Sequence, residues 1–352
     1  DNIEISFARK DVQNSYGLGD YEMKVLYQIR KDYMDNIAGD SIVFLNLRKH
    51  LQKFGIKIDV CTDENINVRS YDLIHIFNTI RTQESYSFMR NAKKYSKKIV
   101  LTPIYWDLSA YYGLTNQFEK IDTWEKSEVK RKYLFKNCDV YLPHCEAEAE
   151  LIRKNYQVDT RYVCIPYGVD ESFKVGNGNY IKEKFGIKEY ILCVGRIHHQ
   201  KNQLSLMKAM AKECIPIILV GSINDMKYFR ECMIIKKENT LILQDVKRDT
   251  LKSIYKGAMV HVLPSWIEYP GLASLEAGIA GCKVVSTEIG STKEIFSQYV
   301  DYCDPSSIDS IYHTVMSALH KKPSPDLRNH IENHYTWSKI AGKVVEVYDS
   351  LV

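Results

Sequence analysis

The chain has 352 residues, enough for two domains that each bury a core of their own. Its formal net charge is only +4, a small value for this length that gives no indication of nucleic-acid binding. Nine cysteines are scattered singly without a C-x-x-C pair, a pattern that favours reduced thiols over a disulfide framework. With no signal peptide and no apolar run of membrane-spanning length, we expect a cytoplasmic protein, at most peripheral to the inner face of a membrane.

The first half alternates strands and helices from Met23 onward. Residues 1–22 precede this pattern and are assigned as an extension or tag without a function. Such alternation predicts a parallel sheet covered on both faces, with ligands gathering at the carboxyl ends of the strands. The first domain is therefore expected over residues 23–168. Its expected strands begin at Met23 and cover 56–61, 73–77, 99–105, 140–142 and 162–165, and its main helices cover 41–54, 86–95 and 124–135.

The segment CIPYGVDESF is turn-rich around Pro166 and Gly168 and predicts the join between two domains. After it the alternation restarts, so a second domain is expected over residues 169–336. An amphipathic helix at 337–351 ends the chain, and residues 337–352 could pack back on the first domain. The expected strands of the second domain cover 190–194, 217–220, 240–243, 259–263 and 283–287, and its helices cover 201–212, 251–256 and 271–279.

The stretch from His261 to Thr287 reads as strand, loop, helix and strand. Pro270 suits a first helical turn because it has no N–H to leave unpaired, and Gly271 lets a ligand approach the backbone closely. The helix would therefore present free N–H groups and the positive end of its dipole, which suits a phosphate or a sugar oxygen. Glu268 before the helix and Glu276 on it would supply acceptors for hydroxyl groups on either side.

Within this stretch, PSWIEYPGLASLEA resembles the E-x7-E motif of glycosyltransferase family 4, whose flanking Gly271 and Leu272 are also in place. The resemblance implies a GT-B fold, in which two doubly wound, Rossmann-like α/β domains face one another across a cleft, and sugar transfer with retention. It also implies that Glu276 binds the ribose and that Glu268 contacts the transferred sugar. The alternative is a surface loop glutamate and an ordinary helix-face glutamate.

A second element, GRIHHQK, follows the strand that ends at Gly195. It resembles the family's G-R-x-x-x-x-K element, which implies that Arg196 and Lys201 hold the donor diphosphate. Each cation about 4 Å from the leaving group would contribute roughly 4 kcal/mol at an effective dielectric of about 20. The sequence contains no D-x-D motif, so we expect transfer without a metal ion and without a cofactor. The alternative is a pair of solvated surface charges.

The acceptor side is expected in the first domain. Gly39 and Asp40 stand where relatives carry a Gly-Gly pair near the donor phosphate, although an N-cap role for Asp40 is the alternative. His75 ends a strand where a histidine is frequent in relatives, but a buried structural histidine is equally expected. Tyr105 and Trp106 could stack on a sugar ring or pack in the core.

Residues 90–136 hold eleven Lys or Arg against five Asp or Glu. Solvated helix faces explain most such runs. The alternative is a basic patch drawn to anionic lipid, which would suit a lipid-linked acceptor.

Together these residues predict a retaining hexosyltransferase acting on a nucleoside-diphosphate sugar, with uracil, guanine and adenine all open as the base. The partner would be a sugar, glycoprotein or lipid-linked acceptor in surface polysaccharide or glycoconjugate synthesis. A sugar-nucleotide epimerase or a phosphorylase would share the two-domain plan, although we find no support for a pyridoxal lysine site. A degenerate, non-catalytic partner protein is the remaining alternative, and such proteins usually lose one of the two charged pairs.

Overall fold

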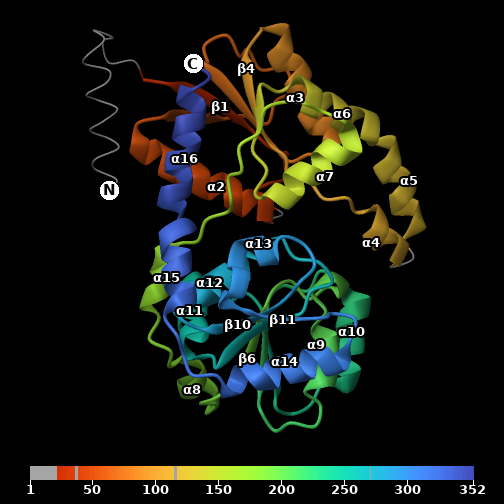
Figure 1. Ribbon diagram of the computed structural model, residues 1–352, viewed down its shortest axis with the longest axis vertical. Helices are drawn as coiled ribbons and strands as arrows, with labels where there is room; N and C mark the ends of the chain where they lie inside the picture. Colours follow the sequence, from red (N-terminus) through yellow and green to blue (C-terminus); the bar gives the residue numbers. More distant parts are fainter. Residues whose placement is uncertain (1–21, 36–38, 115–116, 270) are drawn as a thin grey trace. The chain divides into compact units, whose positions relative to one another are not determined.

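A computed structural model describes residues 22–35, 39–114, 117–269 and 271–352. The chain divides into two compact units, of which the first comprises residues 1–167 with Trp337–Val352 and the second Gly168–Thr336. Figure 1 shows a sheet with helices on both faces in each unit. Every pairing between neighbouring strands is parallel. The predicted fold class of two Rossmann-like α/β domains is therefore confirmed.

The sheet of the first unit has the strand order β2-β1-β3-β4-β5. Its central strand β3 is buried at all five positions of its sequence LIHIF, as expected for a strand covered on both faces. The elements are β1 (Lys24–Gln28), α2 (Gly39–Leu51), β2 (Lys57–Val60), β3 (Leu73–Phe77), α3 (Thr82–Lys94), β4 (Lys98–Thr102), α4 (Ser109–Leu114), α5 (Phe118–Lys126), α6 (Glu128–Asn137), β5 (Val140–Tyr141) and α7 (Glu146–Tyr156), with a 3-10 turn at Gln52–Phe54.

Two expected elements of this unit differ in the structure. The helix expected over 124–135 is split at Ser127, which ends α5 and begins α6. The carbonyl of Trp124 accepts hydrogen bonds from the Ser127 N–H at 3.1 Å and from Arg131 Nη2 at 3.0 Å, so it leaves the helical pattern. The strand expected over 162–165 is reduced to a single bridge between Tyr141 and Tyr162, because the chain follows β5 for only a few residues.

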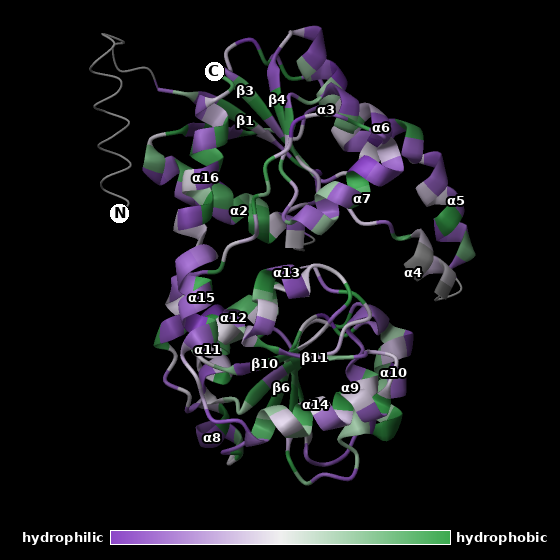
Figure 2. Ribbon diagram, viewed as in Figure 1, coloured by the Kyte–Doolittle hydropathy of each residue, from purple (hydrophilic) through white to green (hydrophobic). Residues whose placement is uncertain are grey.

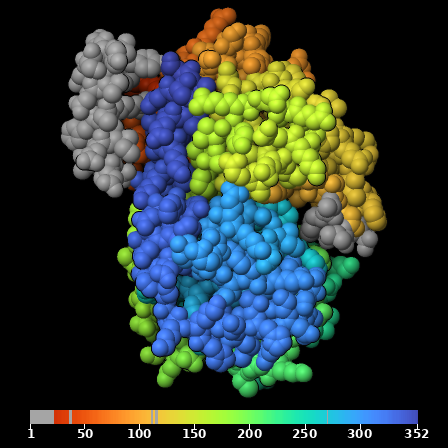
Figure 3. Space-filling model, in the orientation of Figure 1, coloured from red at the N-terminus to blue at the C-terminus, as the bar shows by residue number. Residues whose placement is uncertain are grey.

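The C-terminal helix α16 (Trp337–Asp349) packs against α2 in the first unit. Its Tyr348 hydroxyl lies 2.9 Å from the Tyr27 hydroxyl and 2.5 Å from His75 Nδ1, all fully buried. Arg161 donates to Ser350 Oγ at 3.1 Å, and Figure 3 shows the blue C-terminal segment lying against the yellow-green surface of this unit. The end of the chain therefore contributes directly to the core around β1 and β3.

The sheet of the second unit has the order β11-β10-β9-β6-β7-β8. Alternate residues of its strands face two cores, so that Leu192 and Val284 pack toward α12 while Cys193 and Val285 pack toward α9 and α14. Figure 2 shows the apolar strands between helices whose outer faces are hydrophilic. The elements are α8 (Tyr180–Phe185), β6 (Ile191–Val194), α9 (Gln203–Ala209), β7 (Ile217–Val220), α10 (Met226–Ile235), β8 (Thr240–Leu243), α11 (Arg248–Gly257), β9 (Val260–Leu263), α12 (Leu272–Ala280), β10 (Lys283–Thr287), α13 (Thr292–Phe296), β11 (Asp301–Cys303), α14 (Ile308–His320) and α15 (Asp326–His334), with 3-10 turns at Glu171–Val175, His199–Lys201 and Ser297–Tyr299.

The strand order places two loops next to each other. Strands β6 and β9 are neighbours in the sheet although β7 and β8 lie between them in the chain. Both strands run in the same direction, so the loops that leave their carboxyl ends meet at one edge. Within the part of the chain that the structure describes, no helix is long and apolar enough to cross a bilayer.

Candidate functional site

The loop between β9 and α12 begins the site in the second unit. Gly271 is the N-cap of α12 with φ +75°, a left-handed conformation that glycine adopts without strain. A Cβ at this position would lie 2.9 Å from Glu268 Cγ. Among the described residues no side chain caps α12, so its first N–H groups point toward the loop. Leu272 begins the helix, while the predicted donor-side residue Pro270 lies outside the described residues.

Lys201 and Glu268 form an ion pair across the two neighbouring loops. Lys201 Nζ lies 2.8 Å and 2.9 Å from the two carboxylate oxygens of Glu268. The side chains are 16% and 5% exposed, so the pair is largely shielded from water. The structure thus brings together two of the residues that the sequence singled out, 67 positions apart in the chain.

Hydrogen bonds between the same two loops hold this pair in place. The Trp266 N–H donates to the Gln200 carbonyl at 2.9 Å, and Gln200 Nε2 donates to the Ile267 carbonyl at 3.3 Å. Asn202, with φ +57°, donates its side-chain N–H to the Pro264 carbonyl at 3.0 Å. Lys201 lies between Gln200 and Asn202 in the chain, so hydrogen bonds on both sides fix the position of its backbone.

Arg196 occupies the other end of the β6–α9 loop and is exposed. Within the described ranges its guanidinium makes no hydrogen bond or ion pair, and only its carbonyl is engaged, by Gln203 Nε2 at 2.9 Å. Gly195 precedes it, and a Cβ at Gly221 would lie 2.1 Å from the Gly195 carbonyl oxygen. The strand ends are therefore closely packed, while the Arg196 side chain is available to an anion.

A second loop fixes the backbone of Glu268, which the sequence patterns did not reveal. The Glu268 N–H donates to the Ile289 carbonyl at 3.0 Å, and the Ser291 N–H donates to the Glu268 carbonyl at 3.1 Å. Gly290 lies between these contacts with φ +108°. In the sequence, Gly290 of the segment GSTKEIF is the residue that could have indicated this close approach.

Glu276 lies on α12 in a different environment. It accepts a hydrogen bond from the buried Tyr255 hydroxyl at 3.0 Å, and within the described residues no hydrogen bond or ion pair joins it to Lys201 or Glu268. Burial raises the pKa of Glu276 to about 7, although the Tyr255 hydrogen bond and the charge of Arg248 act in the opposite direction. Its carboxyl group therefore changes charge near neutral pH.

His261 on β9 lies near the charge of Lys201. It is fully buried, and burial together with the nearby charge of Lys201 lowers its pKa to about 3. The histidine is therefore neutral, and its Nε2 accepts a hydrogen bond from the Val194 N–H at 3.4 Å. It does not compete with Lys201 for an anion.

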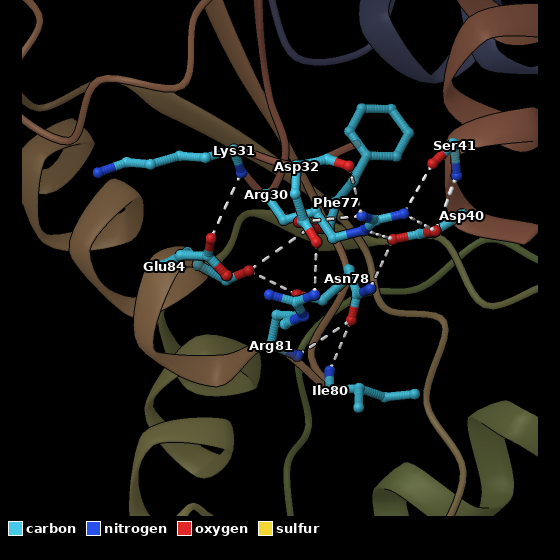
Figure 4. Close-up of polar contacts among 11 residues, drawn as sticks. Arg30, Lys31, Asp32, Asp40, Ser41, Phe77, Asn78, Ile80, Arg81 and Glu84 are labelled. Carbon is cyan, nitrogen blue, oxygen red and sulfur yellow. Dashed lines mark hydrogen bonds and ion pairs between the residues drawn. The ribbon is translucent and has the colours of Figure 1, made fainter. Parts of the chain in front are cut away.

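The predicted acceptor residue Asp40 is buried in a polar network of the first unit. Its carboxylate accepts hydrogen bonds from Arg30 Nε at 2.7 Å, Arg30 Nη2 at 3.0 Å and Asn78 Nδ2 at 2.8 Å (Figure 4). Burial alone would raise the pKa of Asp40, but the bonds from Arg30 and Asn78 hold it below its usual value. Asp40 also accepts from the Ser41 N–H at 2.9 Å, so its carboxylate is engaged by three residues of the first unit.

Three other predicted acceptor residues, His75, Tyr105 and Trp106, are also buried in this unit. His75 is fully buried, with Nε2 2.8 Å from Thr102 Oγ1, and burial lowers its pKa well below the usual value. Tyr105 is 1% exposed and accepts a hydrogen bond from Asn155 at 2.9 Å, and Trp106 packs edge-on against His144. These contacts favour a structural role for His75 and core packing for Tyr105 and Trp106 over contact with an acceptor. Gly39 begins α2, where a Cβ would meet no other atom within 4 Å.

Comparison with known proteins shows a family to which the second unit is similar. Residues 180–337 match the family model described as glycosyl transferases group 1. The match covers less than half of this chain and lies almost wholly in the second unit. Arg196, Lys201, Glu268 and Glu276 all lie inside the matched segment.

Two curated relatives each match part of the chain. One, an uncharacterized glycosyltransferase of Methanocaldococcus jannaschii, is 33% identical over 178 residues, which are 46% of this chain and 45% of the relative. The other, the UDP-Gal:alpha-D-GlcNAc-diphosphoundecaprenol alpha-1,3-galactosyltransferase of Escherichia coli, is 29% identical over 231 residues, 59% of either chain. The chain thus spans about half the length of these relatives.

Among solved structures, sucrose-phosphate synthase from Thermosynechococcus elongatus is similar with a TM-score of 0.80 at 16% identity. The match covers 94% of this chain and 99% of that one. At this identity the likeness concerns the fold, which is GT-B.

Proposed function

We propose that this protein is a glycosyltransferase that moves a hexose from a nucleoside-diphosphate sugar to a hydroxyl of a sugar or glycoconjugate. The observation that carries the proposal is the shielded Lys201–Glu268 pair beside the uncapped amino end of α12. A cation, a carboxylate and free helix N–H groups at the carboxyl edge of a parallel sheet suit a ligand that carries both phosphate and hydroxyl groups.

Each charged residue has a proposed role. Lys201 and the exposed Arg196 bind the diphosphate, and Glu268 accepts hydrogen bonds from the transferred sugar. Glu276 accepts from the ribose hydroxyls, while Gly195, Gly271 and Leu272 line the donor site with backbone atoms. Two cations can stabilise the leaving diphosphate by electrostatics, so transfer is proposed to proceed without a metal ion. The E-x7-E resemblance to family 4 supports retention of configuration.

The names of relatives support a narrower substrate class. The Escherichia coli relative is named for a UDP-sugar donor and an acceptor linked to diphosphoundecaprenol. We accordingly propose a UDP-sugar as donor and a lipid-linked saccharide as acceptor, in surface polysaccharide or glycoconjugate synthesis at the cytoplasmic face of a membrane.

Melting curves with UDP, GDP and ADP test the donor proposal, because a ligand that binds only the folded state raises the melting temperature. We expect UDP to give the largest rise. Incubation with UDP-sugars, with and without saccharide acceptors, then separates the enzyme classes, since an epimerase converts its donor without an acceptor. The absence of a shift with all three nucleotides would contradict nucleotide-sugar binding.

We expect the first unit to bind anionic vesicles. Phe118 on α5 and Val129 on α6 are 64% and 80% exposed, and Lys126 and Lys132 on the same helices are exposed. Arg131 is buried against Trp124, so it does not belong to this surface. Flotation with phosphatidylserine-containing vesicles should exceed flotation with neutral vesicles and should fall at high salt. Equal flotation with both vesicle types would remove the membrane proposal.

UDP affinity is expected to depend on the protonation of Glu276. Its pKa of about 7 means that the carboxylate is lost as the pH falls from 8 to 6, and with it the acceptor for the ribose hydroxyls. Calorimetry should show an affinity that falls by up to about tenfold per pH unit below the pKa. Glu276→Gln should remove this part of the pH dependence and leave only that of the UDP phosphate. An unchanged pH profile in the variant would refute the role.

The same pKa predicts the pH dependence of stability. The folded-state pKa of about 7 lies above the ordinary value of 4.5, so folding takes up a proton between these values. The contribution of this group to stability is fully present below about pH 4.5 and is lost as the pH rises through about 7. Melting temperatures from pH 5 to 8 should therefore decline less in Glu276→Gln than in the wild type.

A further inference from the structure

Ser274 lies in the first turn of α12 and is completely buried. Its backbone N–H donates to the Gly271 carbonyl at 2.8 Å, but its hydroxyl has no hydrogen-bond partner among the described residues. Buried hydroxyl groups in folded proteins almost always have a partner, because leaving one unpaired costs free energy. The unpaired Ser274 hydroxyl is therefore a candidate for a ligand contact if it adjoins a ligand site.

The position of Gly271 shows where that group would lie. A Cβ on Gly271 would be 3.4 Å from Ser274 Oγ and 2.9 Å from Glu268 Cγ. The Ser274 hydroxyl and the Glu268 side chain thus both lie beside Gly271, where any side chain would crowd Glu268. Gly271 is at the amino end of α12, where no side chain caps the helix within the described residues.

We propose that Ser274 is an additional ligand-binding residue, whose hydroxyl donates a hydrogen bond to a phosphate oxygen held at the amino end of α12. The inference rests on the proposed function and adds a specific contact to it. A phosphate oxygen there would accept from the hydroxyl and from the first N–H groups of the helix together, which satisfies donors that otherwise remain unpaired. A neutral hydroxyl also adds no charge beside Glu268.

Calorimetry with UDP and with inorganic pyrophosphate tests this role in wild type and Ser274→Ala. We expect both ligands to bind the variant about 10- to 100-fold more weakly, the effect of one hydrogen bond to a charged group. The melting temperature of the ligand-free variant should stay equal or rise, because the substitution removes an unpaired buried hydroxyl. Weaker binding by a protein that is no less stable would separate ligand contact from structural damage.

Ser286 on β10 offers a matched control. It is also completely buried, and its hydroxyl also lacks a partner among the described residues. Ser286→Ala should bind both ligands as the wild type does. Ser274→Cys keeps a donor, although a weaker one on a somewhat larger side chain, and should bind between wild type and Ser274→Ala, which covers the case that Ser274→Ala folds poorly.

Wild-type affinity for UDP and pyrophosphate in Ser274→Ala would overturn the proposal, as would an equal loss in Ser286→Ala. A wild-type protein that binds neither ligand would overturn the proposed function itself and this contact with it.

Discussion

Lys201→Met is expected to lower glycosyl transfer by about 10²- to 10³-fold, the usual effect of removing one group that stabilises charge in a transition state. It should also destabilise the protein, because Glu268 is 5% exposed and would remain as a buried carboxylate without its cation. Breaking a buried ion pair in this way costs about 3–5 kcal/mol. Transfer assays and denaturant unfolding measure the two effects separately.

The double variant Lys201→Met/Glu268→Gln distinguishes catalysis from stability. Neither residue of the pair is charged in this variant, so stability should largely recover while transfer stays low. Lys208→Met removes an exposed lysine from the following helix and should change neither quantity. Arg196→Ala should lower transfer without lowering the melting temperature, because Arg196 is exposed. Full activity in both Lys201→Met and Arg196→Ala would refute the proposed diphosphate site.

Gly290→Ala should both destabilise the second unit and displace Glu268. A Cβ at residue 290 would lie 2.1 Å from the Glu268 carbonyl oxygen and 2.9 Å from Tyr269 Cε1, and its φ of +108° disfavours any other residue. Either the Glu268 backbone or the Gly290 loop must move, at a cost of at least about 2 kcal/mol. We expect a lower melting temperature and weaker UDP binding.

Gly186→Ala supplies the comparison for this prediction. Gly186 also has a positive φ, +72°, but a Cβ there would meet nothing within 4 Å. Only backbone strain should lower the free energy of unfolding of this variant, by about 1 kcal/mol, and the variant should bind UDP normally. Equal effects in the two variants would show that the close approach of residue 290 to Glu268 affects neither stability nor UDP binding.

Much of the fold could be predicted because it depends on local patterns in the sequence. The apolar runs of β3 and β9 and the helical periodicity of α12 are consequences of residues that are adjacent in the chain. They required no knowledge of distant contacts. The split of the helix at Ser127 could not be predicted in this way, because it depends on Arg131 reaching back to the Trp124 carbonyl.

The sequence by itself determined the two-domain α/β plan and singled out Lys201, Glu268 and Glu276. Only the tertiary structure decided which of these residues meet. Strand order is not encoded in chain order, and it is the adjacency of β6 and β9 that brings Lys201 to Glu268. Burial likewise depends on all surrounding elements, which is why Asp40 and His75, candidates by position, lie in the core of the first unit, while Glu276 has a carboxyl group that titrates near neutral pH.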